Sequence, residues 1–415
     1  MKDASARQNS SGKEKRIAYG REAFINELWS TLEGYPPETN GRSIYINDLR
    51  RIGKTRILEH MEDDPRPGFR VMKRDVEGIN SADVFAQEVY RDTLVFMNKW
   101  RRFGGWTVKT RDACGGFGIW QLKIPEYRYL PCERLLRKTF GHLNECLAKK
   151  DERLVCIWDE LPALLENIID RHGDCLKEGV LEAARLLDTL RAVRQECSHI
   201  YMIFTGSIGM HHILNKLRRN GYKGRPLNDM EPMAPGPLVP EEGKALAARF
   251  LSKRRKLSED MLDTCAETVS EGVGHIPYYI EGLVNTLPSD ISPSSITPEK
   301  IQKILADRLA NSDWDLRYFE ERIPNLYGRE NVFLVNKILD YLAETRNPVT
   351  EKEIVDWINR VAKKGVEASI VHELMDLLVN DHYAVKMGDP VTYSFRSSLI
   401  RRWWCMNHGL KCPLP

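Results

Sequence analysis

Residues 44–58 join a short apolar strand, a tight loop and the start of a helix. Ile44–Asn47 forms the apolar run, Asp48–Gly53 the loop, and Lys54 and Thr55 open an amphipathic helix. A phosphate-binding P-loop needs this context, because its backbone N–H groups and the helix N-terminus must point at a phosphate. We expect Lys54 to reach the β- and γ-phosphates of a nucleotide and the Thr55 hydroxyl to ligate Mg²⁺.

Asp48 departs from the P-loop pattern G-x-x-x-x-G-K-[ST], which has glycine at this position. If the carboxylate faces the phosphates, it weakens nucleotide binding by on the order of 1 kcal/mol. If it points away, we expect it to pair with Arg50 or Arg51. Because of Asp48, a third alternative remains: a scaffold protein that binds nucleotide without hydrolysing it.

A second polar cluster follows an apolar run about a hundred residues downstream. Leu154–Trp158 reads as a strand buried on both faces, and Asp159 and Glu160 follow it at the edge where open α/β sheets bind ligands. We expect Asp159 to hold Mg²⁺ through water and Glu160 to act as the general base on the attacking water. The alternative is that these acids only cap the next helix.

A third strand, predicted over His199–Phe204, also ends in polar residues. Thr205 and Ser207 follow it and are candidates for sensing the γ-phosphate. Three strand ends with polar clusters in this order predict a nucleotide site.

Several segments resemble the archaeal-type ATPases of the AAA+/STAND superfamily. The resemblance runs from about Ile17 to Trp404 and is carried by Tyr19–Glu22, Leu49–Thr55, Asp75–Gly78, Gly274–Tyr279, Tyr318–Arg322, Tyr393–Arg396 and Leu399–Trp404. It implies an ATPase that binds ATP with Mg²⁺. The residues expected to contact the nucleotide are Gly20, Arg21, Arg50, Arg51, Ile52, Gly53, Lys54, Thr55, Arg56, His275 and Pro277.

The predicted fold is α/β: a P-loop NTPase parallel sheet with helices on both faces, then a helical lid and a C-terminal winged-helix domain. The expected boundaries are 1–16 for a disordered tail, 17–235 for the core, 236–330 for the lid and 331–415 for the winged helix. A β-hairpin insertion is expected at about 100–130, where basic and aromatic residues fit either a solvated hairpin, which we favour, or a single-strand nucleic-acid site. Five prolines predict a loop over Gly221–Pro240.

The C-terminal segment matches a winged helix by its helix and hairpin signals. Thr350 and Glu353 form a capping-box signature at the second helix. The third helix carries Glu367, Glu373 and Asp376, and these carboxylates disfavour DNA reading. The segment Leu399–Trp404 fits either a protein-docking surface or simple packing of the last helix.

Composition fits a cytoplasmic protein. The nine cysteines are scattered, with no C-x-x-C pair, which indicates reduced thiols rather than disulfides or zinc. No apolar stretch approaches the roughly 20 residues that span a bilayer, so no membrane association is expected. The formal charge of +3 does not by itself imply a nucleic-acid partner.

Two function classes remain. In the first, ATP binding and hydrolysis switch the arrangement of lid and winged helix, and a partner protein or a homo-oligomer reads the switch in a regulatory or defence role. In the second, a DNA-binding ATPase acts as a loader or transposition-type regulator. We expect the first, with DNA possible but not favoured.

Overall fold

The computed structural model describes most of the chain. The described residues are 17–34, 43–103, 130–173, 175–206, 209–254, 257–288, 296–311, 314–345, 347–362 and 365–411. The tail expected at 1–16 and most of the hairpin expected at 100–130 lie outside them. In the described part of the chain, no helix is long and apolar enough to cross a membrane.

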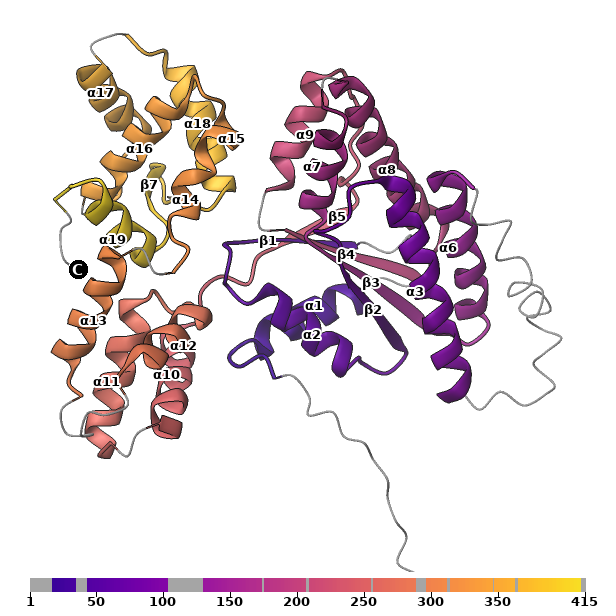
Figure 1. Ribbon diagram of the computed structural model, residues 1–415, viewed down its shortest axis with the longest axis horizontal. Coiled ribbons are helices and arrows are strands. Elements are labelled where there is room, and N and C mark those ends of the chain that lie inside the picture. The colour runs from indigo at the N-terminus through magenta and orange to yellow at the C-terminus, as the bar shows by residue number, and fades with distance from the viewer. Residues whose placement is uncertain are drawn as a thin grey trace, which may run out of the picture.

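A five-stranded parallel sheet forms the first half of the molecule (Figure 1), with the strand order β2-β3-β4-β1-β5. The strands are β1 (Ser43–Asn47), β2 (Phe69–Asp75), β3 (Arg153–Asp159), β4 (Ile200–Gly206) and β5 (Met230–Met233). The parallel P-loop sheet predicted from sequence is confirmed. The loop predicted over Gly221–Pro240 is wrong at its centre, because β5 lies within it. Pro232 lies in that strand, and it can do so because β5 is an edge strand, where one row of N–H groups needs no partner.

Helices cover both faces of this sheet (Figure 1). Alternate residues of β3 face opposite cores: Val155 and Ile157 pack with the helices of one face, and Cys156 and Trp158 with those of the other. A strand buried on both faces needs apolar residues throughout, which explains the continuous apolar run in the sequence. One face carries α1 (Glu22–Glu33) and α2 (Lys54–Asp63), and the other carries α3 (Ala82–Phe103), α6 (Cys132–Ala148), α7 (Leu161–Arg171), α8 (Leu176–Glu196) and α9 (Met210–Arg219).

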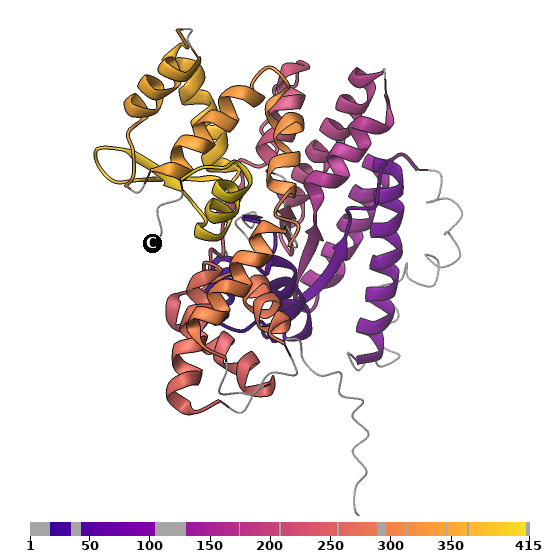
Figure 2. The same ribbon diagram turned by 60° about the vertical axis from the view of Figure 1, so that its left-hand side comes forward.

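The second half of the molecule is mainly helical and lies beside the sheet (Figures 1 and 2). The lid helices are α10 (Pro240–Arg254), α11 (Glu259–Gly272), α12 (Pro277–Thr286) and α13 (Pro298–Ala310). The C-terminal region, defined as residues 318–407, contains α14 (Tyr318–Glu321), α15 (Ile323–Tyr327), α16 (Val332–Glu344), α17 (Glu351–Ala362), α18 (Ala368–Asn380), β6 (Ala384–Met387), β7 (Thr392–Phe395) and α19 (Ser398–Asn407).

From α16 onward, the helix order and the β6–β7 hairpin of the C-terminal region are those expected from sequence. The capping box is present: the Thr350 N–H donates to Glu353 Oε2 at 2.7 Å, and the Glu353 N–H donates to Thr350 Oγ1 at 3.3 Å. Trp403 and Trp404 are buried, and Trp404 Nε1 donates to Asp340 Oδ1 at 2.9 Å. Of the two alternatives for the last helix, packing is therefore correct for both tryptophans.

One hydrophobic core runs through the lid and the C-terminal region without a break. It reaches from Leu246 in α10 to Cys405 in α19. It also includes Leu49 and Ile52, which belong to the P-loop. The loop that is expected to bind phosphate is thus packed into the lid as well as attached to the sheet.

Candidate active site

The P-loop, the acidic end of β3 and the lid enclose a cleft of about 970 Å³. The cleft opens at the carboxyl edge of the sheet, where ligands of open α/β sheets bind. Its walls are formed by Ile17, Ala18, Tyr19, Arg21, Arg50, Arg51, Gly53, Lys54, Thr55, Arg56, Asp75, Glu77, Asp159, Glu160, Leu246, Arg249, Phe250, Lys253, Pro277, Tyr278 and Glu281.

The P-loop backbone turns sharply before α2. Gly53 has φ 102° and Arg51 has φ 70°. A Cβ at Gly53 would meet no atom within 4 Å, so the left-handed backbone, and not lack of space, favours glycine there.

The Lys54 side chain is buried and lies inside the loop. Its Nζ donates to the carbonyl oxygens of Asp48 at 2.6 Å and Leu49 at 3.0 Å. Burial lowers the pKa of Lys54, while the Glu160 and Asp48 carboxylates oppose that effect. Thr55 begins the exposed side of α2 and faces the cleft.

Asp48 points away from the cleft. One carboxylate oxygen accepts from the Leu49 N–H at 2.7 Å and lies 3.2 Å from an Arg396 guanidinium nitrogen. The other accepts from the Gly236 N–H at 2.7 Å. Our alternative of an Asp48 carboxylate facing the phosphates is wrong, and so is the pairing with Arg50 or Arg51. The partner is Arg396, the residue directly after β7.

The acidic end of β3 brings its two carboxylates to the same cleft. Asp159 is buried at the end of the strand, where its Oδ1 accepts from the Thr205 hydroxyl and its Oδ2 lies 3.7 Å from Lys73 Nζ. Glu160 has φ 62° and ψ 39° and precedes the first residue of α7. This left-handed conformation is uncommon for glutamate and is a feature of strained functional sites.

Thr205 does not line the cleft. It is fully buried beneath Asp159, and its Oγ1 also lies 3.4 Å from the Glu160 backbone nitrogen. This position fits a role in orienting the acidic pair rather than direct contact with a γ-phosphate. Ser207 lies outside the described residues.

Arg21, Gly20 and Ile52 connect the P-loop to its surroundings. The Arg21 guanidinium donates to the carbonyl oxygens of Ile52 at 2.8 Å, Pro235 at 2.9 Å and Gly236 at 2.8 Å. Ile52 is buried in the lid core, and a Cβ on Gly20 would lie 2.9 Å from Leu238. Gly20 and Ile52 do not line the cleft, whereas Arg21 reaches its edge.

The lid contributes Pro277 to the cleft, but not His275. The His275 ring bonds to Ser270 Oγ at 2.8 Å, and the His275 carbonyl accepts from the Leu238 N–H at 3.0 Å. His275 therefore does not line the cleft, because local hydrogen bonds hold the residue at the turn before α12.

The cleft also contains aromatic residues that sequence reasoning did not single out as site residues. Arg51 lies over the Tyr278 ring, 4.4 Å from its centroid, and Arg249 lies 3.7 Å from the centroid of Tyr19. Phe250 is a third aromatic residue that lines the cleft. Tyr19 and Tyr278 fall within segments that carried the family resemblance, which was the available signal.

Comparisons with solved structures agree with this architecture. No family model matches the chain, and no similar sequence was found among curated proteins. The structure is similar to a Walker-type ATPase of Pyrococcus abyssi, with a TM-score of 0.60 and 15% identity over 93% of this chain and 96% of that one. It is also similar to the ORC2 protein of Aeropyrum pernix in its ADPNP–ADP complexes, with a TM-score of 0.53 and 12% identity over 97% of each chain. The chain therefore has the fold of the archaeal-type P-loop AAA+ ATPases.

Proposed function

We propose that this protein binds ATP with Mg²⁺, hydrolyses it slowly, and acts as a STAND-type switch for a partner protein or a second copy. The observation that carries the proposal is the shared cleft: Lys54, Thr55 and the Asp159–Glu160 pair face it from the sheet, and Pro277 and Tyr278 face it from the lid. A nucleotide in this cleft touches both halves of the molecule. Its phosphate state can therefore bias how the halves are arranged.

The residues of the cleft suit the chemistry of ATP hydrolysis. The oxygens of Thr55 and Asp159 are the hard ligands that Mg²⁺ prefers, and the ion, when bound, neutralises charge on the phosphates. Glu160 lies next to Asp159 at the strand end, where a carboxylate can accept a proton from an attacking water. The rings of Tyr19 and Tyr278 fit a role in stacking on the base.

Contacts between the P-loop side and the C-terminal region support the switch. Asp48 pairs with Arg396, and Asn47 Nδ2 donates to the Asn380 carbonyl at 3.2 Å. Lys54 holds the carbonyls of Asp48 and Leu49, and a bound phosphate competes for the same ammonium group. Phosphate binding thus acts on the loop that holds Arg396. We also propose that the chain is divided into a core that ends at residue 235, a lid that ends at residue 330, and a winged-helix domain.

Replacing Lys54 by Ala is expected to abolish measurable ATP binding, because it removes the buried cation at the P-loop. Isothermal titration calorimetry with ATP and Mg²⁺ measures the effect. Lys253→Ala is the control, since Lys253 lines the same cleft from the lid and should retain most of the affinity. Equal affinity in Lys54→Ala and the native chain would place the nucleotide elsewhere.

Replacing Glu160 by Gln should separate binding from turnover. The amide keeps the shape of the side chain but cannot accept a proton, so we expect hydrolysis to fall by roughly 10² or more with ATP affinity retained. Phosphate release and ATP titration report the two quantities. Glu77→Gln changes another carboxylate that lines the cleft, and its turnover should stay within a few-fold of the native rate. Full hydrolysis in Glu160→Gln would exclude Glu160 as the base.

The Asp48→Asn variant tests whether the P-loop carboxylate serves the P-loop or the C-terminal region. Because the Asp48 side chain is fully buried against Arg396, we expect a loss of roughly 1–3 kcal/mol in unfolding free energy and no tighter ATP binding. Asp315→Asn is the matched control, because its ion pair with Arg51 is exposed and is worth at most about 1 kcal/mol. If Asp48→Asn binds ATP more tightly and its stability to denaturant is unchanged, the Asp48 carboxylate faces the phosphates instead.

A DNA-loading role is the alternative, and the surface of α18 argues against it. Its exposed residues include His372, Glu373 and Asp376, and the His372 ring lies 2.9 Å from Glu351. We expect the full chain to bind duplex DNA weakly and without DNA-stimulated hydrolysis. Glu373→Lys combined with Asp376→Lys should raise duplex affinity several-fold at low salt, as measured by fluorescence anisotropy. Tight, salt-steep duplex binding by the native chain would favour the loader.

A further inference from the structure

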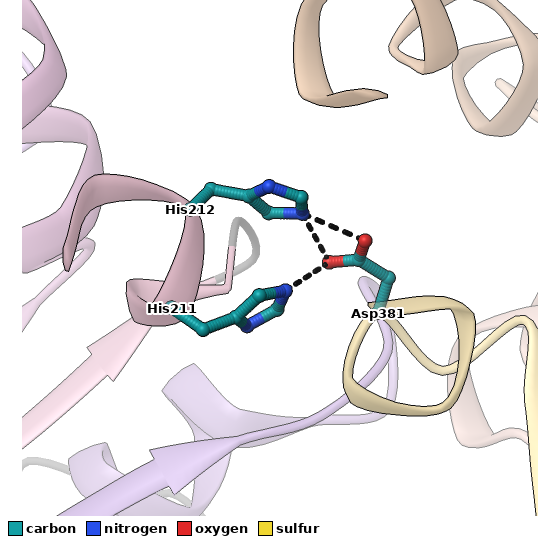
Figure 3. A group of neighbouring side chains, drawn as sticks. All are labelled: His211, His212 and Asp381. Atoms are coloured by element: carbon teal, nitrogen blue, oxygen red, sulfur yellow. Dashed lines mark hydrogen bonds and ion pairs between the residues drawn. The ribbon is translucent and has the colours of Figure 1, made fainter. Parts of the chain in front are cut away.

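A cluster of two histidines and one aspartate joins the sheet half to the C-terminal region (Figure 3). His211 and His212 lie in the first turn of α9, and Asp381 follows the last residue of α18. Figure 3 shows both rings pointing from α9 toward the same carboxylate, which approaches from the opposite side. The proposed nucleotide chemistry uses none of these residues.

The ligand atoms of the cluster are already near the spacing of a metal centre. His212 Nε2 lies 2.7 Å from Asp381 Oδ2 and 2.9 Å from Oδ1, and His211 Nε2 lies 3.2 Å from the same Oδ1. The three ligand atoms all lie within 4.8 Å of one another. In a tetrahedral site with bonds near 2.0–2.1 Å, ligand atoms are about 3.3 Å apart. Small side-chain rotations are enough to admit an ion.

Asp381 is held in place from behind. The Tyr327 hydroxyl donates to its Oδ2 at 2.6 Å, and Arg322 Nη2 donates to its backbone carbonyl at 3.0 Å. Oδ2 thus accepts from Tyr327 and also lies near His212, and Oδ1 lies within 3.2 Å of the Nε2 atoms of both imidazoles. Hydrogen bonds of this kind orient the ligands of metal sites and are nearly as important as the ligands. The Asp381 side chain is 1% exposed, whereas His211 is 21% exposed, so solvent reaches the cluster on the His211 side.

We propose that His211, His212 and Asp381 bind one divalent transition-metal ion of the Zn²⁺ class. Two imidazoles and one carboxylate suit Zn²⁺, Co²⁺ or Ni²⁺, whereas Mg²⁺ and Ca²⁺ prefer oxygen ligands alone. Three protein ligands leave a fourth position for water. The ion connects residues 169 positions apart in the chain, and so clips α9 to the C-terminal region.

Cobalt and zinc binding to the full-length chain test this site. We expect one equivalent of Co²⁺ to give the visible absorption of a low-symmetry nitrogen and oxygen site without a thiolate charge-transfer band, and Zn²⁺ to displace it. The missing thiolate band separates this site from binding at cysteine. His212→Ala and Asp381→Asn should each weaken binding at least tenfold. His372→Ala, which removes another histidine beside carboxylates, should leave it unchanged.

Tyr327→Phe tests the same site without removing a ligand. The loss of its hydroxyl should weaken Zn²⁺ binding by about tenfold, since it no longer orients the carboxylate. Zn²⁺ should also raise the melting temperature of the native chain and of His372→Ala, but not that of His212→Ala. If the native chain, His212→Ala and Tyr327→Phe bind Co²⁺ equally, or if none binds above the background set by excess chelator, the cluster is only a hydrogen-bonded contact. The proposal is then overturned, whatever the ATPase measurements show.

Discussion

The structure depends on a P-loop that is packed from two sides. Ile46 and Ile57, just before and after the loop, belong to the core between the sheet and α1–α2, whereas Leu49 and Ile52 belong to the core of the lid and C-terminal region. Protein interiors are close-packed, so a change of loop conformation cannot be absorbed locally. A phosphate that rearranges the loop must also repack the lid. This packing gives a physical basis for coupling the nucleotide to the second half of the molecule.

Asp48 stands where the P-loop pattern has glycine, and its carboxylate is bound by groups outside the cleft. Considered alone, a carboxylate in a P-loop repels phosphates. In the folded chain it accepts hydrogen bonds from Leu49 and Gly236 and pairs with Arg396. A buried carboxylate is tolerated only with such partners. They come from the P-loop, from Gly236 between β5 and α10, and from Arg396 directly after β7. The residue that breaks the P-loop pattern therefore joins the P-loop to the C-terminal region.

Sequence reasoning succeeded where a local pattern determines the structure. The strand expected over Ile44–Asn47 is present within β1, because a short apolar run is a local signal, and the Thr350–Glu353 capping box is a local hydrogen-bond pair. It failed where pairing depends on distant residues. The strand β5 forms only because it can lie beside β1, and the proline at its centre obscured it. Arg396 is 348 positions from Asp48, so no local signal identified it.

One turn of the C-terminal region contacts the end of β1 and the helix that follows the neighbouring strand β4. The Asn380 carbonyl accepts from Asn47 at the end of β1, and the Asp381 carboxylate faces the histidines of α9, which follows β4. Asn47 and Gly206 are partners in the β1–β4 pair, so both contacts are made at one edge of the sheet. The buried Arg322 fixes the turn through the Asp381 carbonyl and the Tyr383 hydroxyl. Because the P-loop extends from β1, and β4 carries Thr205 beneath the acidic pair, a displacement of either strand end acts on the same turn. The proposed metal ion would strengthen the contact with α9 without touching the nucleotide. Metal binding and nucleotide binding would therefore make separate contributions to the stability of the contact between the C-terminal region and the sheet.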